Sequence, residues 1–155
     1  MSDNLIEIVI LRHGEAGTAS SDRERPLTDY GREQVSSQYQ WLLDQGFLPE
    51  LILHSPYRRT SETAILAADF FHDAKIKIEP LLKPDADPAI ISSLIPTLGN
   101  SRILLVSHMP LVSYLTAAIS EGIQPFAFPV AGLCWLNLNR ETLSAKLFHK
   151  KWPDL

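Results

Sequence analysis

Residues 5–15 read LIEIVILRHGE, an apolar run that passes directly into charged and polar residues. A nearly continuous apolar run of this length is typical of a strand that is buried on both faces of a parallel sheet. Arg12 and His13 follow at the point where that strand would end. The sequence therefore predicts a guanidinium group and an imidazole together at one edge of a sheet.

Strands and helices are predicted to alternate along the rest of the chain. Apolar runs predict strands at residues 6–11, 51–53, 75–79, 102–106, 133–138 and 143–148. Helical spacing and end signals predict helices from 28 to 46, 55 to 71, 89 to 98 and 110 to 122. This order predicts an α/β fold, a three-layer sandwich with a mostly parallel central sheet, helices on both faces and an antiparallel pair at the end.

Two of these helices have recognisable start signals. Thr28 is expected to be the N-cap of the first helix, and Ser55 the N-cap of the second, with Pro56 at the first helical position. Arg58 and Arg59 would then lie in the first turn of the second helix, where the helix dipole disfavours cations. We therefore expect an anionic group close to this helix start.

Composition limits the class of protein. The 155 residues, 45% of them hydrophobic, fit one domain over residues 1–155. The 18 acidic residues outnumber the 14 basic ones, which argues against a nucleic-acid binder. The single cysteine, Cys134, fits a reducing compartment, and neither a signal sequence nor an apolar run of membrane-spanning length is apparent. We expect a cytoplasmic monomer that binds neither nucleic acid nor membrane.

Three motifs follow predicted parallel strands and should meet at one edge of the sheet. They are Arg12-His13, the segment 55–59 and Ser107-His108. Ligands of open α/β sheets bind beyond the carboxyl ends of the strands. A histidine beside guanidinium groups can attack phosphorus while those groups hold the phosphoryl oxygens. Either His13 or His108 could instead be structural, as we expect for His54, His72 and His149.

The same segments resemble a known family. LRHGE at 11–15, RPLT at 25–28 with Gly31, SPYRRTSETA at 55–64 and VSHMPLV at 106–112 together resemble the histidine phosphatase superfamily, which has a phosphoglycerate mutase-like fold. Within it, the short length and the last block are most similar to the SixA type of phosphohistidine phosphatase. The resemblance implies a covalent phosphohistidine intermediate on a histidine nucleophile.

The resemblance also implies roles for individual residues. His13 would be the nucleophile, with Arg12, Arg59 and His108 binding the phosphoryl group. Arg25 would contact the substrate. Arg58 would be an accessory substrate-binding residue, and we also predict that Ser55, at the same helix start, binds substrate. No cofactor is implied, and the histidines lack a third ligand at zinc-site spacing, so no metal is expected.

One departure from the family pattern concerns the leaving group. Members that cleave alcohol phosphates usually carry a glutamic acid in a Leu-x-Glu context after the third strand, whereas residues 78–87 read IEPLLKPDAD. An alkoxide leaving group needs a proton, but imidazole leaving from a phosphoramidate accepts one near neutral pH. The missing acid favours cleavage of a phosphorus–nitrogen bond, although Glu79, Asp85 or Asp87 could still supply a proton.

The loops suggest the size of the substrate. Residues 15–27 and 80–88 are too few to form a capping domain, so we expect an open site that admits a phosphohistidine on another folded protein. The predicted function is a protein phosphohistidine phosphatase in phosphorelay signalling, acting on a partner such as a histidine phosphotransfer domain. Two alternatives are a phosphatase or mutase for small phosphate esters and a non-catalytic module that binds phosphorylated partners.

Overall fold

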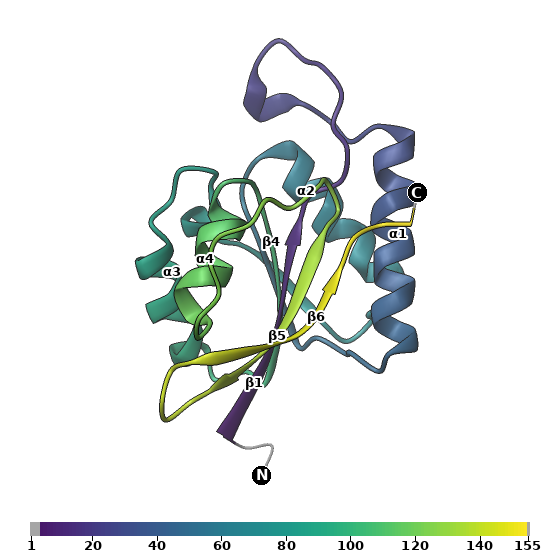
Figure 1. The fold of residues 1–155 in the computed structure, drawn as a ribbon. Coiled ribbons are helices and arrows are strands. Elements are labelled where there is room, and N and C mark those ends of the chain that lie inside the picture. The colour runs from purple at the N-terminus through teal and green to yellow at the C-terminus, as the bar shows by residue number, and fades with distance from the viewer. Residues whose placement is uncertain (1–3, 155) are drawn as a thin grey trace.

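A six-stranded sheet runs through the molecule in the order β3-β2-β4-β1-β5-β6 (Figure 1). The computed structural model describes residues 4–154. β1 pairs in parallel with β4, β4 with β2, and β2 with β3, whereas β5 and β6 are antiparallel to their neighbours. The strands are β1 (Leu5–Arg12), β2 (Leu51–His54), β3 (Lys75–Ile78), β4 (Arg102–Ser107), β5 (Leu133–Asn139) and β6 (Ala145–Lys151).

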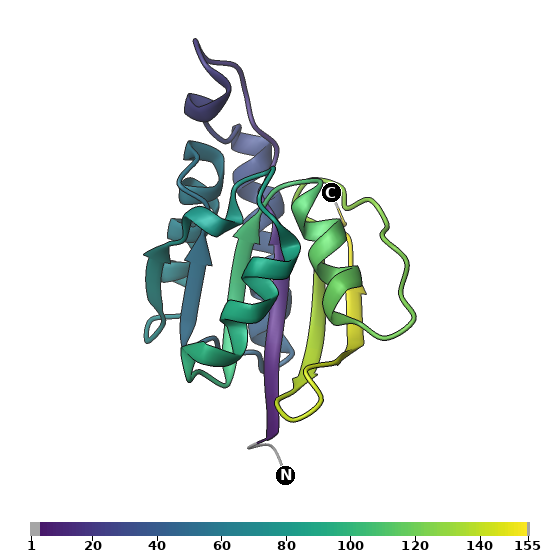
Figure 2. The same cartoon turned by 90° about the vertical axis from the view of Figure 1, so that its left-hand side faces the viewer.

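Helices cover both faces of this sheet (Figure 2). α1 (Asp29–Asp44) and α2 (Arg58–Leu66) pack on one face, and α3 (Pro88–Leu94) and α4 (Leu111–Ile119) on the other. β1 supplies both cores, because Ile8 and Ile10 point to one face and Val9 to the other, all fully buried. The predicted three-layer α/β sandwich is confirmed.

Several predicted boundaries were wrong. Ser55 is not an N-cap: Tyr57 holds that position, without a side-chain cap, and α2 starts at Arg58. The Ser55 hydroxyl instead accepts a hydrogen bond from the Tyr57 amide at 3.2 Å, which closes a turn before the helix. By contrast, Thr28 is the N-cap of α1 and accepts from the Gly31 amide at 2.9 Å.

Short 3-10 turns account for other differences. The helix predicted at 55–71 ends as α2 at Leu66 and continues as the 3-10 turn Ala67–Asp69. The helix predicted at 89–98 tightens into a 3-10 turn at Ile95–Leu98, where Pro96 lacks the amide that an α-helix needs. The last strand starts at Ala145 rather than at 143, because Leu143 has a φ of 59° and belongs to the turn.

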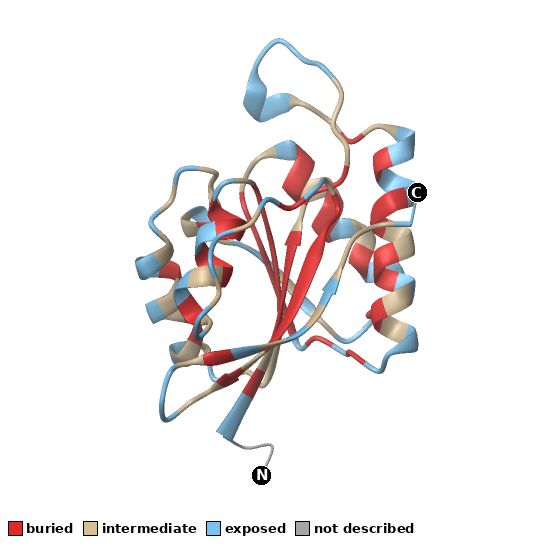
Figure 3. Ribbon diagram, viewed as in Figure 1, coloured by how far each residue is buried: buried red, intermediate tan, exposed pale blue. Residues whose placement is uncertain are grey.

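Residues 16–27 form an arm that projects beyond the carboxyl edge of the sheet (Figure 1). An antiparallel bridge between Ala16 and Leu27 closes its base, and the 3-10 turn Asp22–Glu24 lies farther out. Residues 18–24 are all exposed (Figure 3). Within residues 4–154, none of the helices has the length and apolar character that crossing a membrane requires.

Candidate active site

The carboxyl ends of three adjacent parallel strands bring the predicted motifs together. β1 lies beside β4, and β4 beside β2. The His13 amide donates to the Ser107 carbonyl at 3.1 Å, and the Ser55 amide to the Val106 carbonyl at 3.2 Å. The rings of His13 and His108 lie 5.2 Å apart. Residues some 95 positions apart in the chain thus share one buried site.

Backbone contacts fix the tautomer of His13. Its Nδ1 lies 2.7 Å from the Gly14 carbonyl oxygen, which can only accept, so Nδ1 carries the proton. Nε2 is left with a lone pair and accepts from Arg59 Nε at 3.2 Å. Gly14 allows this turn to lie against α1, since a Cβ there would be only 2.6 Å from the Gly31 carbonyl oxygen. The Gly14 carbonyl is therefore the acceptor that fixes the tautomer, and the nitrogen that would attack phosphorus is unprotonated.

The surroundings of His13 oppose its protonation. Burial lowers its pKa from 6.5 to about 3, although the hydrogen bond to Gly14 acts in the opposite direction. The charges of Arg59, Arg12 and Arg25 lower the pKa further. The imidazole is thus neutral at physiological pH and beside three cationic groups, which suits a nucleophile for a phosphoryl group.

Two arginines reach the site from different elements. Arg59 is buried in the first turn of α2, where it donates to the Asp22 carbonyl at 2.8 Å and packs on the Tyr57 ring. Arg12, at the end of β1, donates through Nη1 to the Phe128 carbonyl at 2.7 Å, and its buried Nε has no protein partner within residues 4–154. Burial, followed by the charge of Arg59, lowers the pKa of Arg12. Both guanidinium groups can donate to phosphoryl oxygens.

His108 follows β4 and is held by Ser55. Its Nε2 lies 2.8 Å from the Ser55 hydroxyl, and the Tyr57 ring packs edge-on against it at 4.9 Å. Its Nδ1 is buried without a hydrogen-bond partner among the described residues. Burial is the main reason why the pKa of His108 is lowered to about 2, followed by the positive charge that His13 gains in acid and by the charges of Arg59 and Arg12.

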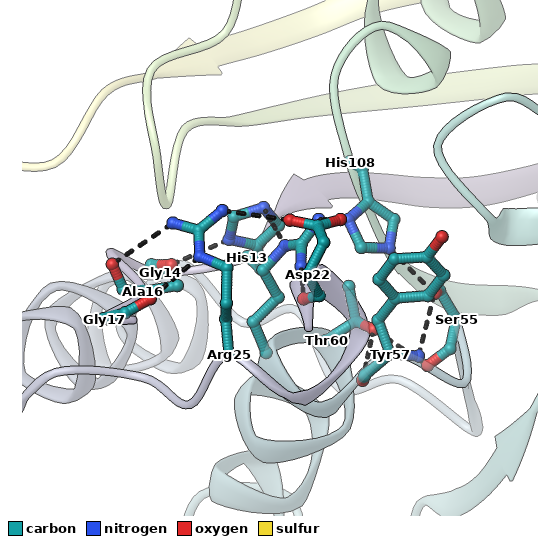
Figure 4. Close-up of polar contacts among 11 residues, drawn as sticks. His13, Gly14, Ala16, Gly17, Asp22, Arg25, Ser55, Tyr57, Thr60 and His108 are labelled. Carbon is teal, nitrogen blue, oxygen red and sulfur yellow. Dashed lines mark hydrogen bonds and ion pairs between the residues drawn. The ribbon is translucent and has the colours of Figure 1, made fainter. Parts of the chain in front are cut away.

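The arm adds a carboxylate that the sequence analysis missed. Asp22 lies 3.3 Å from Arg59 Nη2 and 3.2 Å from Arg25 Nη1 (Figure 4). Arg25 is fixed by further bonds to the carbonyl oxygens of Gly17 and Ala16. The hydrogen bond from Arg25 lowers the pKa of Asp22, so this carboxylate is ionised. No capping or periodicity signal marks Asp22 in the sequence, because only the fold of the arm brings it to Arg59.

The other candidates lie elsewhere. Arg58 is half exposed, and its Nε donates to the Glu62 carboxylate at 2.9 Å one helical turn away. Glu79 and Asp87 accept from the backbone amides of Leu81 and Ala89, and Asp85 is exposed.

Residues 4–154 hold no group of three or more His, Cys, Asp or Glu side chains suited to a metal ion.

Comparisons with known proteins agree with this geometry. The sequence profile of the histidine phosphatase superfamily (branch 1) matches residues 8–83. The phosphohistidine phosphatase SixA of Escherichia coli (strain K12) is 31% identical over 139 residues, which cover 86% of each chain. The chain belongs to the histidine phosphatase superfamily. The SixA homologue of Haemophilus influenzae (strain ATCC 51907 / DSM 11121 / KW20 / Rd) is 34% identical over 84% of this chain and 88% of its own.

Solved structures of superfamily members share the fold. The protein histidine phosphatase SixA complexed with tungstate superposes with a TM-score of 0.91 at 29% identity, over 96% of this chain and 97% of that one. A putative SixA from Agrobacterium tumefaciens has a TM-score of 0.81 at 24% identity, over 96% and 98% of the two chains. The predicted superfamily membership and the SixA-type resemblance are confirmed.

Proposed function

We propose that this protein is a phosphohistidine phosphatase with His13 as its nucleophile. The observation that carries the proposal is the neutral His13 ring, with Nδ1 bonded to the Gly14 carbonyl and Nε2 directed at the Arg59 guanidinium. The likeness to proteins named phosphohistidine phosphatase SixA supports it. Arg12, Arg59 and His108 are assigned to the phosphoryl oxygens.

The reaction proceeds in two displacements at phosphorus. His13 Nε2 attacks in line, the bond between phosphorus and the substrate nitrogen breaks, and its electron pair stays on that nitrogen. The leaving imidazole, protonated on its other nitrogen, departs as a neutral ring. Water then attacks the phosphohistidine and breaks the Nε2–phosphorus bond, and both protons of the water stay on the phosphate formed. Throughout, the Gly14 carbonyl keeps the proton on Nδ1 of His13.

The charge balance favours a nitrogen leaving group. No proton donor is required when the substrate ring brings its own proton, whereas an alkyl ester would leave as an alkoxide of high pKa. Glu79 and Asp87 cap backbone amides, and Asp22 is kept ionised by Arg25. Three of the four carboxyl groups considered as proton donors are thus occupied or ionised, and the fourth, Asp85, is exposed. This arrangement supports a phosphoramidate substrate.

The position of the site at the carboxyl edge of the sheet suits a substrate carried by another protein. Helices flank the sheet, and the arm projects beyond its carboxyl edge (Figure 1). We propose a histidine phosphotransfer domain, or a related phosphohistidine carrier, as the partner in a cytoplasmic phosphorelay. The chain would act on it as a monomer of one domain, because every proposed phosphoryl-binding group lies within this chain.

The test is phosphate release from a phosphorylated histidine phosphotransfer domain and from a simple alkyl phosphate, measured side by side. We expect the carrier to be hydrolysed faster by a factor on the order of 10²–10⁴, the usual contribution of a general acid. His13→Ala should abolish release from both substrates. Faster turnover of the ester would contradict the proposal and favour small phosphate esters. Carrier binding without any turnover would favour a non-catalytic module.

A further inference from the structure

One nitrogen of His108 lacks a partner in a fully buried setting. His108 is 1% exposed, and its Nδ1 is unbonded within residues 4–154, while Nε2 lies 2.8 Å from the Ser55 hydroxyl. A buried polar atom without a partner costs free energy unless a ligand satisfies it. Figure 4 shows one ring nitrogen directed at Ser55 and the other on the side of His13 and Asp22.

The hydrogen bonds of Ser55 decide which nitrogen of His108 carries the proton. The Ser55 oxygen already accepts from the Tyr57 amide at 3.2 Å, and its single hydrogen needs an acceptor. The Nε2 of His108 is the acceptor within reach. When the hydroxyl donates to Nε2, that nitrogen is unprotonated, and the proton of the neutral ring lies on Nδ1.

We propose that Ser55 is a positioning residue that holds His108 in the Nδ1–H tautomer, so that a hydrogen-bond donor faces the phosphoryl oxygens. Its part in catalysis rests on the proposed function. With the opposite tautomer, Nδ1 would present a lone pair to oxygens that are themselves negatively charged. The Ser55 hydrogen would also lose its acceptor. Ser55 therefore acts through His108 rather than on the substrate, in contrast to the substrate-binding role predicted from the sequence.

The backbone around Ser55 is built to keep this hydroxyl in place. Ser55 is fully buried, and its amide donates to the Val106 carbonyl at 3.2 Å. Its carbonyl accepts from the Thr60 hydroxyl at 2.8 Å and lies 2.9 Å from His54 Nδ1. These contacts hold the turn after β2 next to the end of β4, which carries His108. Because the backbone is fixed at this turn, the Ser55 hydroxyl stays within hydrogen-bond distance of His108 and can determine its tautomer.

The tautomer can be measured directly by two-bond ¹H–¹⁵N NMR on the full chain labelled with ¹⁵N-histidine. We expect protonated Nδ1 on His108 in the unmodified protein. In Ser55→Ala the proton should shift wholly or partly to Nε2. Tungstate, used as a phosphate mimic, should then bind about 10 to 100 times more weakly, the loss typical of a hydrogen bond to a charged group. Ser55→Thr, which keeps a hydroxyl, should restore the Nδ1–H tautomer.

Ser107→Ala is the matched control. Ser107 is also a buried serine at a strand end next to His108, but its hydroxyl donates to the Leu82 carbonyl at 2.7 Å. It should keep both the tautomer and the tungstate affinity. A proton on Nε2 in the unmodified protein would overturn the proposal, and so would unchanged tautomer and affinity in Ser55→Ala. Neither readout needs turnover, so an inactive protein with Nδ1–H on His108 would contradict the proposed function alone.

Discussion

The largely buried groups at the base of the site differ from the arm above it in how far their charged side chains are exposed to water. We call Arg12, His13, Ser55, Arg59 and His108 the floor of the site. His13 and Arg59 in the floor are each 6% exposed, whereas the side chain of Asp22 in the arm is 61% exposed. The floor is therefore placed by strand pairing and packing, and the arm by surface hydrogen bonds that water can replace.

Because they differ in exposure, the floor and the arm should have different functions. In the floor, burial keeps both histidines neutral and leaves cationic groups ready for an anion. In the arm, Asp22 meets the same Arg59 guanidinium that is assigned to the phosphoryl group. Asp22 thus competes with a phosphoryl group for Arg59. We infer that the floor determines the chemistry and that the arm adjusts the affinity for anions.

The largest expected effect comes from removing the nucleophile in the floor. His13→Ala should lower the rate of phosphate release from a phosphohistidine carrier by at least about 10⁴-fold, because no covalent intermediate can form. The measurement is single-turnover hydrolysis, with circular dichroism to show that the variant is folded. Residual turnover within about tenfold of the unmodified protein would refute the assignment of His13.

The neighbouring residues Arg58 and Arg59 should differ in their effect on activity, because Arg59 is buried and Arg58 is half exposed. Arg59→Ala should lower kcat/KM by about 10²–10³-fold, since a preorganised donor to the phosphoryl oxygens is lost. Arg58→Ala, one position earlier on α2, should change it by less than about fivefold, because Arg58 is half exposed and paired with Glu62. Equal losses for the two variants would show that Arg58 also binds the substrate.

The buried histidines should make folding sensitive to acid. Their pKa values, about 3 for His13 and about 2 for His108, lie below the ordinary 6.5, so the unfolded chain binds protons that the folded chain does not. The contribution of these two neutral histidines to the free energy of unfolding should therefore be complete above about pH 6.5. It should decrease as the pH falls toward their folded-state pKa values. The limit is about 1.4 kcal/mol per pH unit for each histidine.

Urea unfolding from about pH 7 to about pH 4.5 measures this slope. His13→Asn should have a shallower slope than the unmodified protein, because one of the two groups is removed. Identical slopes would mean that His13 is not kept neutral by burial.

The smallest effect is expected in the arm. Asp22→Asn should tighten tungstate binding by about two- to fivefold, which is the range for an exposed ion pair. Glu24→Gln removes the same charge from the same exposed 3-10 turn and serves as the control, with a smaller change expected. Isothermal titration calorimetry measures both variants. Weaker binding in Asp22→Asn would show that the carboxylate orders the guanidinium groups rather than competing with the anion.

The sequence predicted the floor better than the arm, for physical reasons. The apolar run in β1 required burial on both faces, and parallel pairing then brought His13 and His108 to one edge. The helix dipole did not separate Arg58 from Arg59, because both lie in the first turn. The resemblance to the superfamily assigned the role to Arg59, and the structure adds that Arg59 faces inward.

The features that escaped prediction depend on local turns. Ser55 is of a residue type that is common at N-caps. Its hydroxyl, however, closes a turn with Tyr57 and forms a hydrogen bond with His108 at the end of the neighbouring strand. Such a tertiary contact leaves no trace in helix-start statistics. Asp22 meets Arg59 because the arm folds back over α2. Neither apolar periodicity nor capping patterns encode that fold.

Trapping the phosphohistidine intermediate tests most directly whether His13 is the nucleophile. The protein is mixed with a histidine phosphotransfer domain labelled with ³²P, quenched in alkali within milliseconds, and digested for mass spectrometry under alkaline conditions. We predict label on His13, stable to alkali and lost in acid, that forms and decays at the rate of carrier dephosphorylation. Turnover of the carrier without label on His13, or label on another residue, would show that His13 is not the nucleophile.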